Sequence, residues 1–195
     1  MQTNLRVRHF ASGIFLLLGL FMIAGVNGFG QRSDVETIDA TAFGTSTQLG
    51  RNFGVKLMIY EFSAPEDRDV LVQAFAKEQN DGLVNALEKM KSVGRITIPG
   101  TLGYDVSYIR EIITPTGRTI RFVTNRKIAF GESYWNTQTK SFNLTAGELN
   151  LNDNDKSKSG GVLYPAAQLI VNKEGELQFE LNQNAWKLVN IIEWK

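Results

Sequence analysis

Apolar and polar residues alternate along most of the chain with the two-residue period of β-strands. This alternation runs from Thr37 to the C-terminus and is interrupted once, between Ser63 and Gly94. Turn residues separate the alternating stretches at short intervals, which favours an antiparallel meander over parallel crossover units. Strands are expected at Ala40 to Thr47, Val55 to Tyr60, Ile96 to Ile98, Tyr104 to Ile113, Thr119 to Asn125, Ile128 to Trp135, Ser141 to Leu151, Val162 to Val171, Leu177 to Leu181 and Trp186 to Trp194.

The interruption has the pattern of two short helices. Pro65 followed by Glu66 and Asp67 is typical of a helix start. The apolar residues then recur at helical spacing in two stripes, separated by a break at residues 80–82: Leu71, Ala74 and Phe75, then Leu83, Val84, Leu87 and Met90. A helical hairpin is therefore predicted at about residues 64–93. Because Met58 and Tyr60 give the Val55 strand apolar bulk on its second face, we expect the hairpin to cover that face.

These elements predict an α+β domain, mostly antiparallel β-sheet, with one inserted helical hairpin. About nine or ten strands suit a barrel-like sheet or two packed layers equally well, and periodicity does not separate them. Residues 31–195 are enough for a single β-rich domain with its own core.

The N-terminal segment has the layout of a signal peptide. Arg6 and Arg8 precede an apolar stretch from Phe10 to Val26, and the small residues Gly28 and Gly30 follow it. We expect residues 1–30 to be removed and the mature protein to be exported to the periplasm or the exterior, without stable membrane insertion. The alternative is an uncleaved membrane anchor formed by the uncharged run.

Composition narrows the chemistry of the mature chain. Loss of Arg6 and Arg8 from 21 basic residues leaves 19 against 20 acidic ones, a net charge of −1. A nearly neutral chain without a basic tract does not have the charge pattern of a nucleic-acid-binding protein. Cysteine is absent and His9, the only histidine, lies in the expected signal peptide, so we predict no metal site and no cofactor.

Two polar patterns are candidates for a catalytic or a metal site. Asp153, Asp155 and Ser157 alternate as in a calcium loop, but Lys158 stands where that loop needs glycine, which favours a solvated loop. Carboxylates on the expected strands could support hydrolysis by a carboxylate pair, although ordinary solvent-facing positions explain them better: Asp105, Glu111, Glu132 and Glu148.

Aromatic residues on the strands give a weak indication of ligand binding. Most are expected to pack in the core, but several could line a cavity. Tyr134 and Trp135 are adjacent, so one ring should point away from the core. The candidate ligand-binding residues are Tyr104, Tyr108, Tyr134 and Trp135.

Part of the chain resembles a group of secreted bacterial proteins of uncharacterised function, over roughly residues 55–135. The residues that carry this resemblance are Leu83, Val84, Ala86, Leu87, Met90, Lys91, Val93, Gly94 and Arg95, then Tyr104 and Asp105, then Gly117, Arg118, Val123, Thr124, Asn125 and Arg126. The resemblance implies an exported bacterial protein and implies no substrate.

Together these observations favour a non-catalytic binding module for a small, partly apolar ligand, held in an internal pocket of the β framework. One alternative is an envelope module that binds another protein through a sheet edge or an aromatic patch. The other is a carboxylate-dependent hydrolase.

Overall fold

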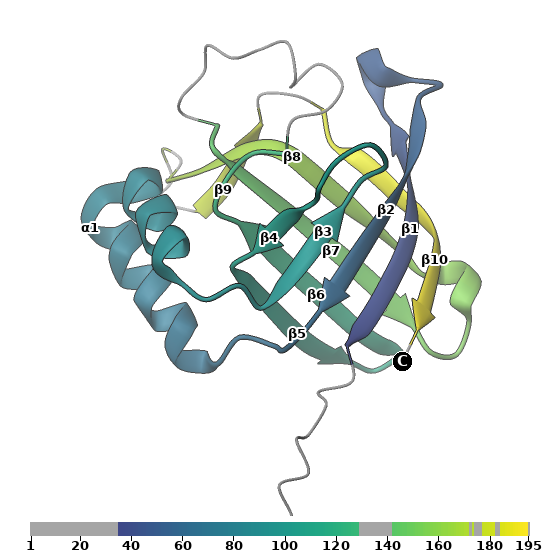
Figure 1. Ribbon diagram of the computed structural model, residues 1–195, viewed down its shortest axis with the longest axis horizontal. Helices are drawn as coiled ribbons and strands as arrows, with labels where there is room; N and C mark the ends of the chain where they lie inside the picture. The colour runs from purple at the N-terminus through teal and green to yellow at the C-terminus, as the bar shows by residue number, and fades with distance from the viewer. Residues whose placement is uncertain (1–34, 129–141, 172, 174–176, 182–183, 195) are drawn as a thin grey trace, which may run out of the picture. The chain divides into compact units, whose positions relative to one another are not determined.

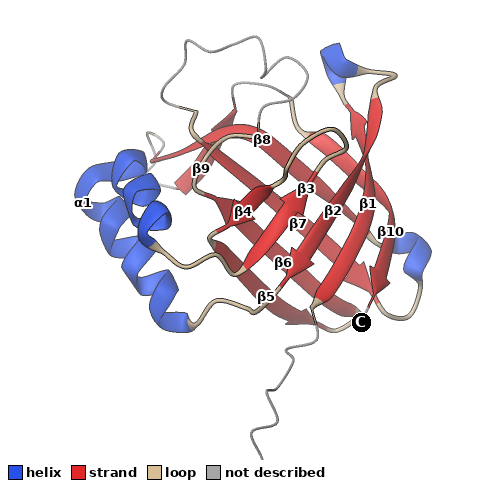
Figure 2. Ribbon diagram, in the orientation of Figure 1, coloured by secondary structure: helices blue, strands red, loops and turns tan. Residues whose placement is uncertain are grey.

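The computed structural model describes residues 35–128, 142–171, 173, 177–181 and 184–194, all within the unit Ser33–Lys195. These residues form one antiparallel sheet, one α-helix and two short 3-10 helices, at Ser46–Gln48 and Lys156–Lys158 (Figure 1, Figure 2). The strands are β1 (Glu36–Gly44), β2 (Asn52–Ile59), β3 (Gly94–Thr97), β4 (Tyr104–Val106), β5 (Tyr108–Thr114), β6 (Gly117–Thr124), β7 (Leu144–Asn152), β8 (Gly160–Val171), β9 (Leu177–Leu181) and β10 (Trp186–Trp194).

The strand order is β4-β3-β2-β1-β10-β8-β7-β6-β5, with β9 paired to β8. β4 and β5 stand at the two ends of this order, yet only Ser107 separates them in the chain. The Ser107 N–H donates to the carbonyl of Val123 on β6, 3.2 Å away. The sheet therefore curves into a nearly closed barrel, which decides between the two architectures that the sequence left open.

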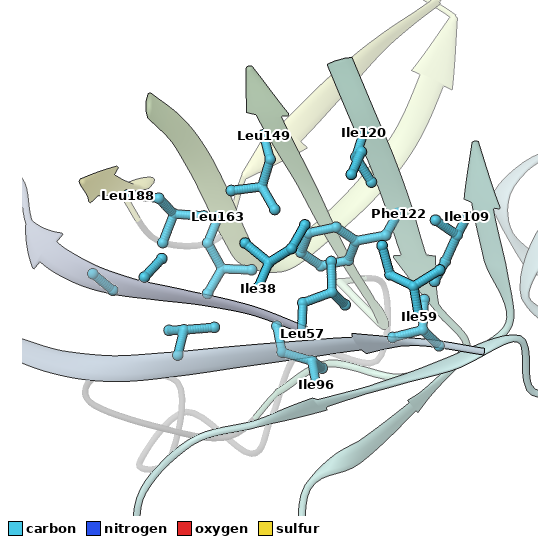
Figure 3. Packing of buried hydrophobic residues seen from close by; sticks show 14 of the residues in the cluster. Ile38, Leu57, Ile59, Ile96, Ile109, Ile120, Phe122, Leu149, Leu163 and Leu188 are labelled. Atoms are coloured by element: carbon cyan, nitrogen blue, oxygen red, sulfur yellow. The ribbon is translucent and has the colours of Figure 1, made fainter. Parts of the chain in front are cut away.

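The inside of this barrel is packed with apolar side chains. Ile38, Leu57 and Ile96 project from one side toward Ile120 and Phe122 on the other (Figure 3), and each is at most 2 % exposed. Alternate residues of each strand supply this cluster, as the two-residue period requires. Among the described residues, a packed apolar cluster therefore lies where the sequence suggested a ligand pocket.

Most described strands lie within a few residues of their expected positions. The strand expected at Ala40 to Thr47 differs, because β1 begins at Glu36 and ends at Gly44, and a 3-10 helix follows at Ser46–Gln48. A second expected strand is divided in two. The single strand expected from Tyr104 to Ile113 is split at Ser107, because β4 pairs with β3 whereas β5 pairs with β6. Residues 129–141, which include most of the strand expected at Ile128 to Trp135, lie outside the described residues.

Helix α1 (Pro65–Lys89) begins at the proline, as expected, and the Asp67 carboxylate accepts a hydrogen bond from the Ala64 N–H at 2.8 Å. The helix is interrupted by non-helical backbone at Glu78 and Gln79, just before the break expected at residues 80–82. Gln79 has a positive φ of 54°, a conformation that L-residues rarely adopt. The chain is therefore α+β with one interrupted helical segment.

The position of the helix differs from the expectation. Its buried side chains pack on the outer face of β5 to β8, whereas Met58 on β2 is only half-buried and Tyr60 is exposed. The segment before the helix explains this difference. The Ser63 N–H donates to the Ile109 carbonyl at 2.8 Å, and the Ile109 N–H donates to Ser63 Oγ at 3.0 Å, so the chain reaches β5 before the helix starts.

Candidate functional site

A groove of about 520 Å³ lies between α1 and the outer face of β5, β6, β7 and β8. Figure 1 shows the helix beside this part of the barrel. Most of the lining is apolar, and the helix supplies Leu71, Val72, Phe75, Leu83 and Leu87. The volume is within the range of roughly 300–1,000 Å³ that is usual for small-molecule sites.

The sheet contributes an apolar row to the floor of the groove. The strand register places Tyr108, Val123, Ala146 and Tyr164 side by side across β5, β6, β7 and β8. Burial raises the pKa of Tyr108 and outweighs the opposing effect of Arg110 and Arg68, so its phenol stays protonated at neutral pH. The row therefore presents an apolar surface with a tyrosine at each end.

A charged row lies next to the apolar row, two residues further along each strand. It consists of Arg110, Arg121, Glu148 and Val162, which are again paired in register. Arg121 Nε donates to Glu148 Oε2 at 2.7 Å, and Asn150 Nδ2 donates to Glu148 Oε1 at 3.1 Å. Burial acts to raise the pKa of Glu148, but these hydrogen bonds outweigh it and the pKa is lowered. Glu148 is therefore a carboxylate at neutral pH.

The helix that covers the groove is fixed to the sheet by packing and by one polar side chain. Leu87 is fully buried and belongs to a cluster that includes Leu144 of β7. The buried Asn80 accepts a hydrogen bond from the Leu169 N–H of β8 at 2.9 Å and donates to Asn143 Oδ1 at 2.8 Å. These contacts hold the second part of the helix against the sheet, and Leu71 and Phe75 of the first part belong to the same apolar cluster.

The structure separates the aromatic residues that the sequence singled out. Tyr108 lines the groove. Tyr104 does not: it packs against the cluster inside the barrel, and the Arg126 guanidinium lies 5.4 Å from its ring centre. Tyr134 and Trp135 lie outside the described residues.

The carboxylates considered for hydrolysis are held by arginines. Arg95 binds Asp105 at 2.9 Å, Arg118 binds Glu111 at 2.8 Å, and Arg121 binds Glu148, while Glu132 lies outside the described residues. These three carboxylates are on different parts of the barrel, and Glu148 alone lines the groove. Its lowered pKa is the reverse of what a general acid needs.

A second polar cluster closes one end of the barrel. Arg118 is 11 % exposed, and its guanidinium binds Glu36 of β1, Glu111 of β5 and Glu193 of β10. Lys156 Nζ also contacts Glu193, at 2.8 Å. Because three carboxylates occupy the guanidinium, we interpret this cluster as a structural link between strands.

The loop considered for calcium binding uses its oxygens internally. Asp155 Oδ1 accepts hydrogen bonds from the backbone N–H and the hydroxyl of Ser157, and Lys158 lies 3.4 Å from the other carboxylate oxygen. Within the described ranges, no group of three or more acidic side chains could hold a metal ion.

Sequence reasoning missed the joint contribution of Arg68, Arg110 and Arg121 to the groove. Arg110 and Tyr108 are two residues apart on one strand, so their side chains point to the same face of the sheet. The approach of Arg68 depends on the position of the helix, for which the sequence carried no signal.

Comparison of the chain with protein-family models, curated proteins and solved structures found no match. In the part of the chain that the structure describes, no helix combines the length and the apolar character required to cross a bilayer.

Proposed function

We propose that this protein is an exported, non-catalytic binding module that holds a small, largely apolar ligand in the groove between α1 and the outer face of β5 to β8. One observation carries the proposal: a ligand-sized groove whose helical wall is apolar except for Arg68 faces a row of apolar and tyrosine side chains on the sheet. The packed interior of the barrel moves the proposed site from the inside, where the sequence suggested it, to this outer face.

The helix supports the proposal because it forms one wall of the groove and is attached to the sheet by its own contacts. We infer that its two parts, on either side of Gln79, form the hairpin that the sequence suggests. In support, a Cβ atom at Gly82 would lie only 2.3 Å from the Ala74 carbonyl oxygen, so the second part approaches the first closely. Glycine is required there by this close approach of backbone.

The test introduces a large side chain into the groove at a partly exposed position. Val72 lines the groove and is 51 % exposed, whereas Val70, two residues earlier on the same helix, is 53 % exposed and does not line it. The protein, expressed from its full sequence and purified, is titrated with the neutral fluorescent probe N-phenyl-1-naphthylamine. We expect Val72→Trp to weaken binding about tenfold or more, because the indole occupies the space of the ligand, and Val70→Trp to leave it unchanged.

Absence of probe binding to the unmodified protein, or equal binding by the two variants, would overturn the proposed site. Native mass spectrometry of protein purified from its own envelope fraction gives an independent readout. A stoichiometric small molecule that is lost in Val72→Trp supports the proposal, whereas a bound protein retained by both variants would favour the envelope-interaction alternative.

A further inference from the structure

We propose, building on the function above, that the ligand is an amphiphile with one anionic oxyacid head group and an alkyl chain, and that Arg110 binds the head group together with Arg68 and Arg121. Three arginines and one glutamate line the groove. The whole chain has 21 basic and 20 acidic residues, so this excess of positive charge is local.

Arg110 and Arg121 oppose each other on neighbouring strands, a pairing of like charges that destabilises a sheet unless something compensates it. Glu148 compensates Arg121 through a hydrogen bond of 2.7 Å. No ion pair of Arg110 is found among the described residues. An anion at Arg110 would therefore remove the remaining repulsion and gain a charge-assisted hydrogen bond.

Arg68 brings a third positive charge to the same end of the groove, from the first part of α1. It lies close enough to Tyr108 to act on its ionisation, as does Arg110, and the neighbouring Asp67 acts in the opposite sense. Its contact with the adjacent Asp69 is loose, at 3.8 Å, and both side chains are more than half exposed. Arg68 is thus available to a bound anion at little cost, because a surface pair of this kind contributes little stability.

The apolar part of the ligand is placed by the spacing of the two rows. The charged row and the apolar row are two residues apart along each strand, or roughly 7 Å. Beyond the apolar row, Leu144 and Leu169 continue the lining away from the arginines. A head group at Arg110 therefore directs an alkyl chain along Tyr108 and Val123 toward the leucines.

The experiment compares three ligands of equal chain length, below their micelle-forming concentrations, by displacement of N-phenyl-1-naphthylamine. These are dodecanoate, dodecanol and dodecyltrimethylammonium. We expect dodecanoate to bind about tenfold or more tightly than dodecanol, because arginine forms a charge-assisted hydrogen bond with a carboxylate. Dodecyltrimethylammonium should bind most weakly, because the arginines repel its positive charge.

Arg110→Gln should weaken dodecanoate binding about tenfold and leave dodecanol binding unchanged. Arg68→Gln should have a smaller effect in the same direction. Arg51→Gln, at an exposed arginine outside the groove, is the matched control and should change neither. Dodecyl phosphate in place of dodecanoate then shows which oxyacid the arginines prefer.

Equal affinity for dodecanoate and dodecanol would overturn the head-group inference and leave the groove proposal standing. Loss of dodecanol binding in Arg110→Gln would also overturn it, because the variant would then have altered the groove itself. If no ligand binds the unmodified protein and Val72→Trp changes nothing, the proposed function itself fails.

Discussion

At the scale of single residues, the wall between the barrel interior and the groove is only one backbone thick at Gly147. This glycine lies opposite Phe122 in the strand register and lines the groove with its backbone. The Phe122 ring fills the space that a side chain at residue 147 would need on the inner face, and it is 1 % exposed. The packing of this ring thus sets the position of the groove floor.

Gly147→Ala should therefore destabilise the protein. A Cβ atom there would lie 2.2 Å from Phe122 Cζ, so the buried ring would have to shift. We expect the free energy of unfolding to fall by about 1–3 kcal/mol, as for other overpacked cores, measured by chemical denaturation. Gly54→Ala is the control, because the nearest atom to its Cβ is Pro99 Cγ at 4.0 Å, and it should be neutral or slightly stabilising. Equal stability of the two variants would contradict this view of the floor.

At the scale of elements, the attachment of α1 to β8 depends on Asn80. Replacing it with alanine leaves the Leu169 N–H without its side-chain acceptor in a partly buried position. We expect Asn80→Ala to lower the free energy of unfolding by about 1–3 kcal/mol and to speed hydrogen exchange of the Leu169 amide. Asn85→Ala, at an exposed position of the same helix, should do neither. Unchanged exchange at Leu169 in Asn80→Ala would show that apolar packing alone holds the helix.

The elements themselves were predictable because their signals are local. Alternation along β2 or β10, and Pro65 at the start of α1, are properties of a few neighbouring residues. The contact partners were not predictable in this way. The helix follows β2 in the chain, but hydrogen bonds between Ser63 and Ile109, 46 residues apart, direct it to β5. Tyr108 was singled out for its ring alone, and its place in the groove follows from that long-range contact.

At the scale of the whole molecule, the Arg118 cluster links strands that are far apart in the sequence. Glu36 is 82 positions before Arg118 and Glu193 is 75 positions after it. The guanidinium of Arg118 on β6 therefore binds carboxylates of β1 and β10, the first and last strands in chain order. Burial acts to lower the pKa of Arg118, but hydrogen bonds to the glutamates raise it overall, so the arginine stays charged. Burial acts to raise the pKa of Glu193, but hydrogen bonds from Lys156 and Arg118 outweigh it and the pKa is lowered.

This balance predicts that the contribution of the cluster to the free energy of unfolding depends on pH in opposite ways in the natural protein and in Arg118→Met. A lowered pKa in the folded state contributes stability above the unfolded value, near 4.3 for glutamate, and that stability is lost as the pH falls through the folded value. In Arg118→Met three carboxylates remain together without their central cation, and their repulsion should lower the free energy of unfolding by about 2 kcal/mol or more at pH 7. Proton uptake relieves that repulsion, so the deficit should shrink as the pH falls from 7 toward 4.

Urea denaturation of both proteins between pH 7 and pH 4 measures the deficit directly. Lys91→Met breaks the exposed pair of Lys91 with Glu61 and is the control, with an expected cost below about 1 kcal/mol at every pH. A deficit for Arg118→Met that stays constant over this range would mean that the variant is destabilised by lost packing. A deficit that narrows only for Arg118→Met would show that the charges of the Arg118 cluster contribute to the acid sensitivity of the barrel.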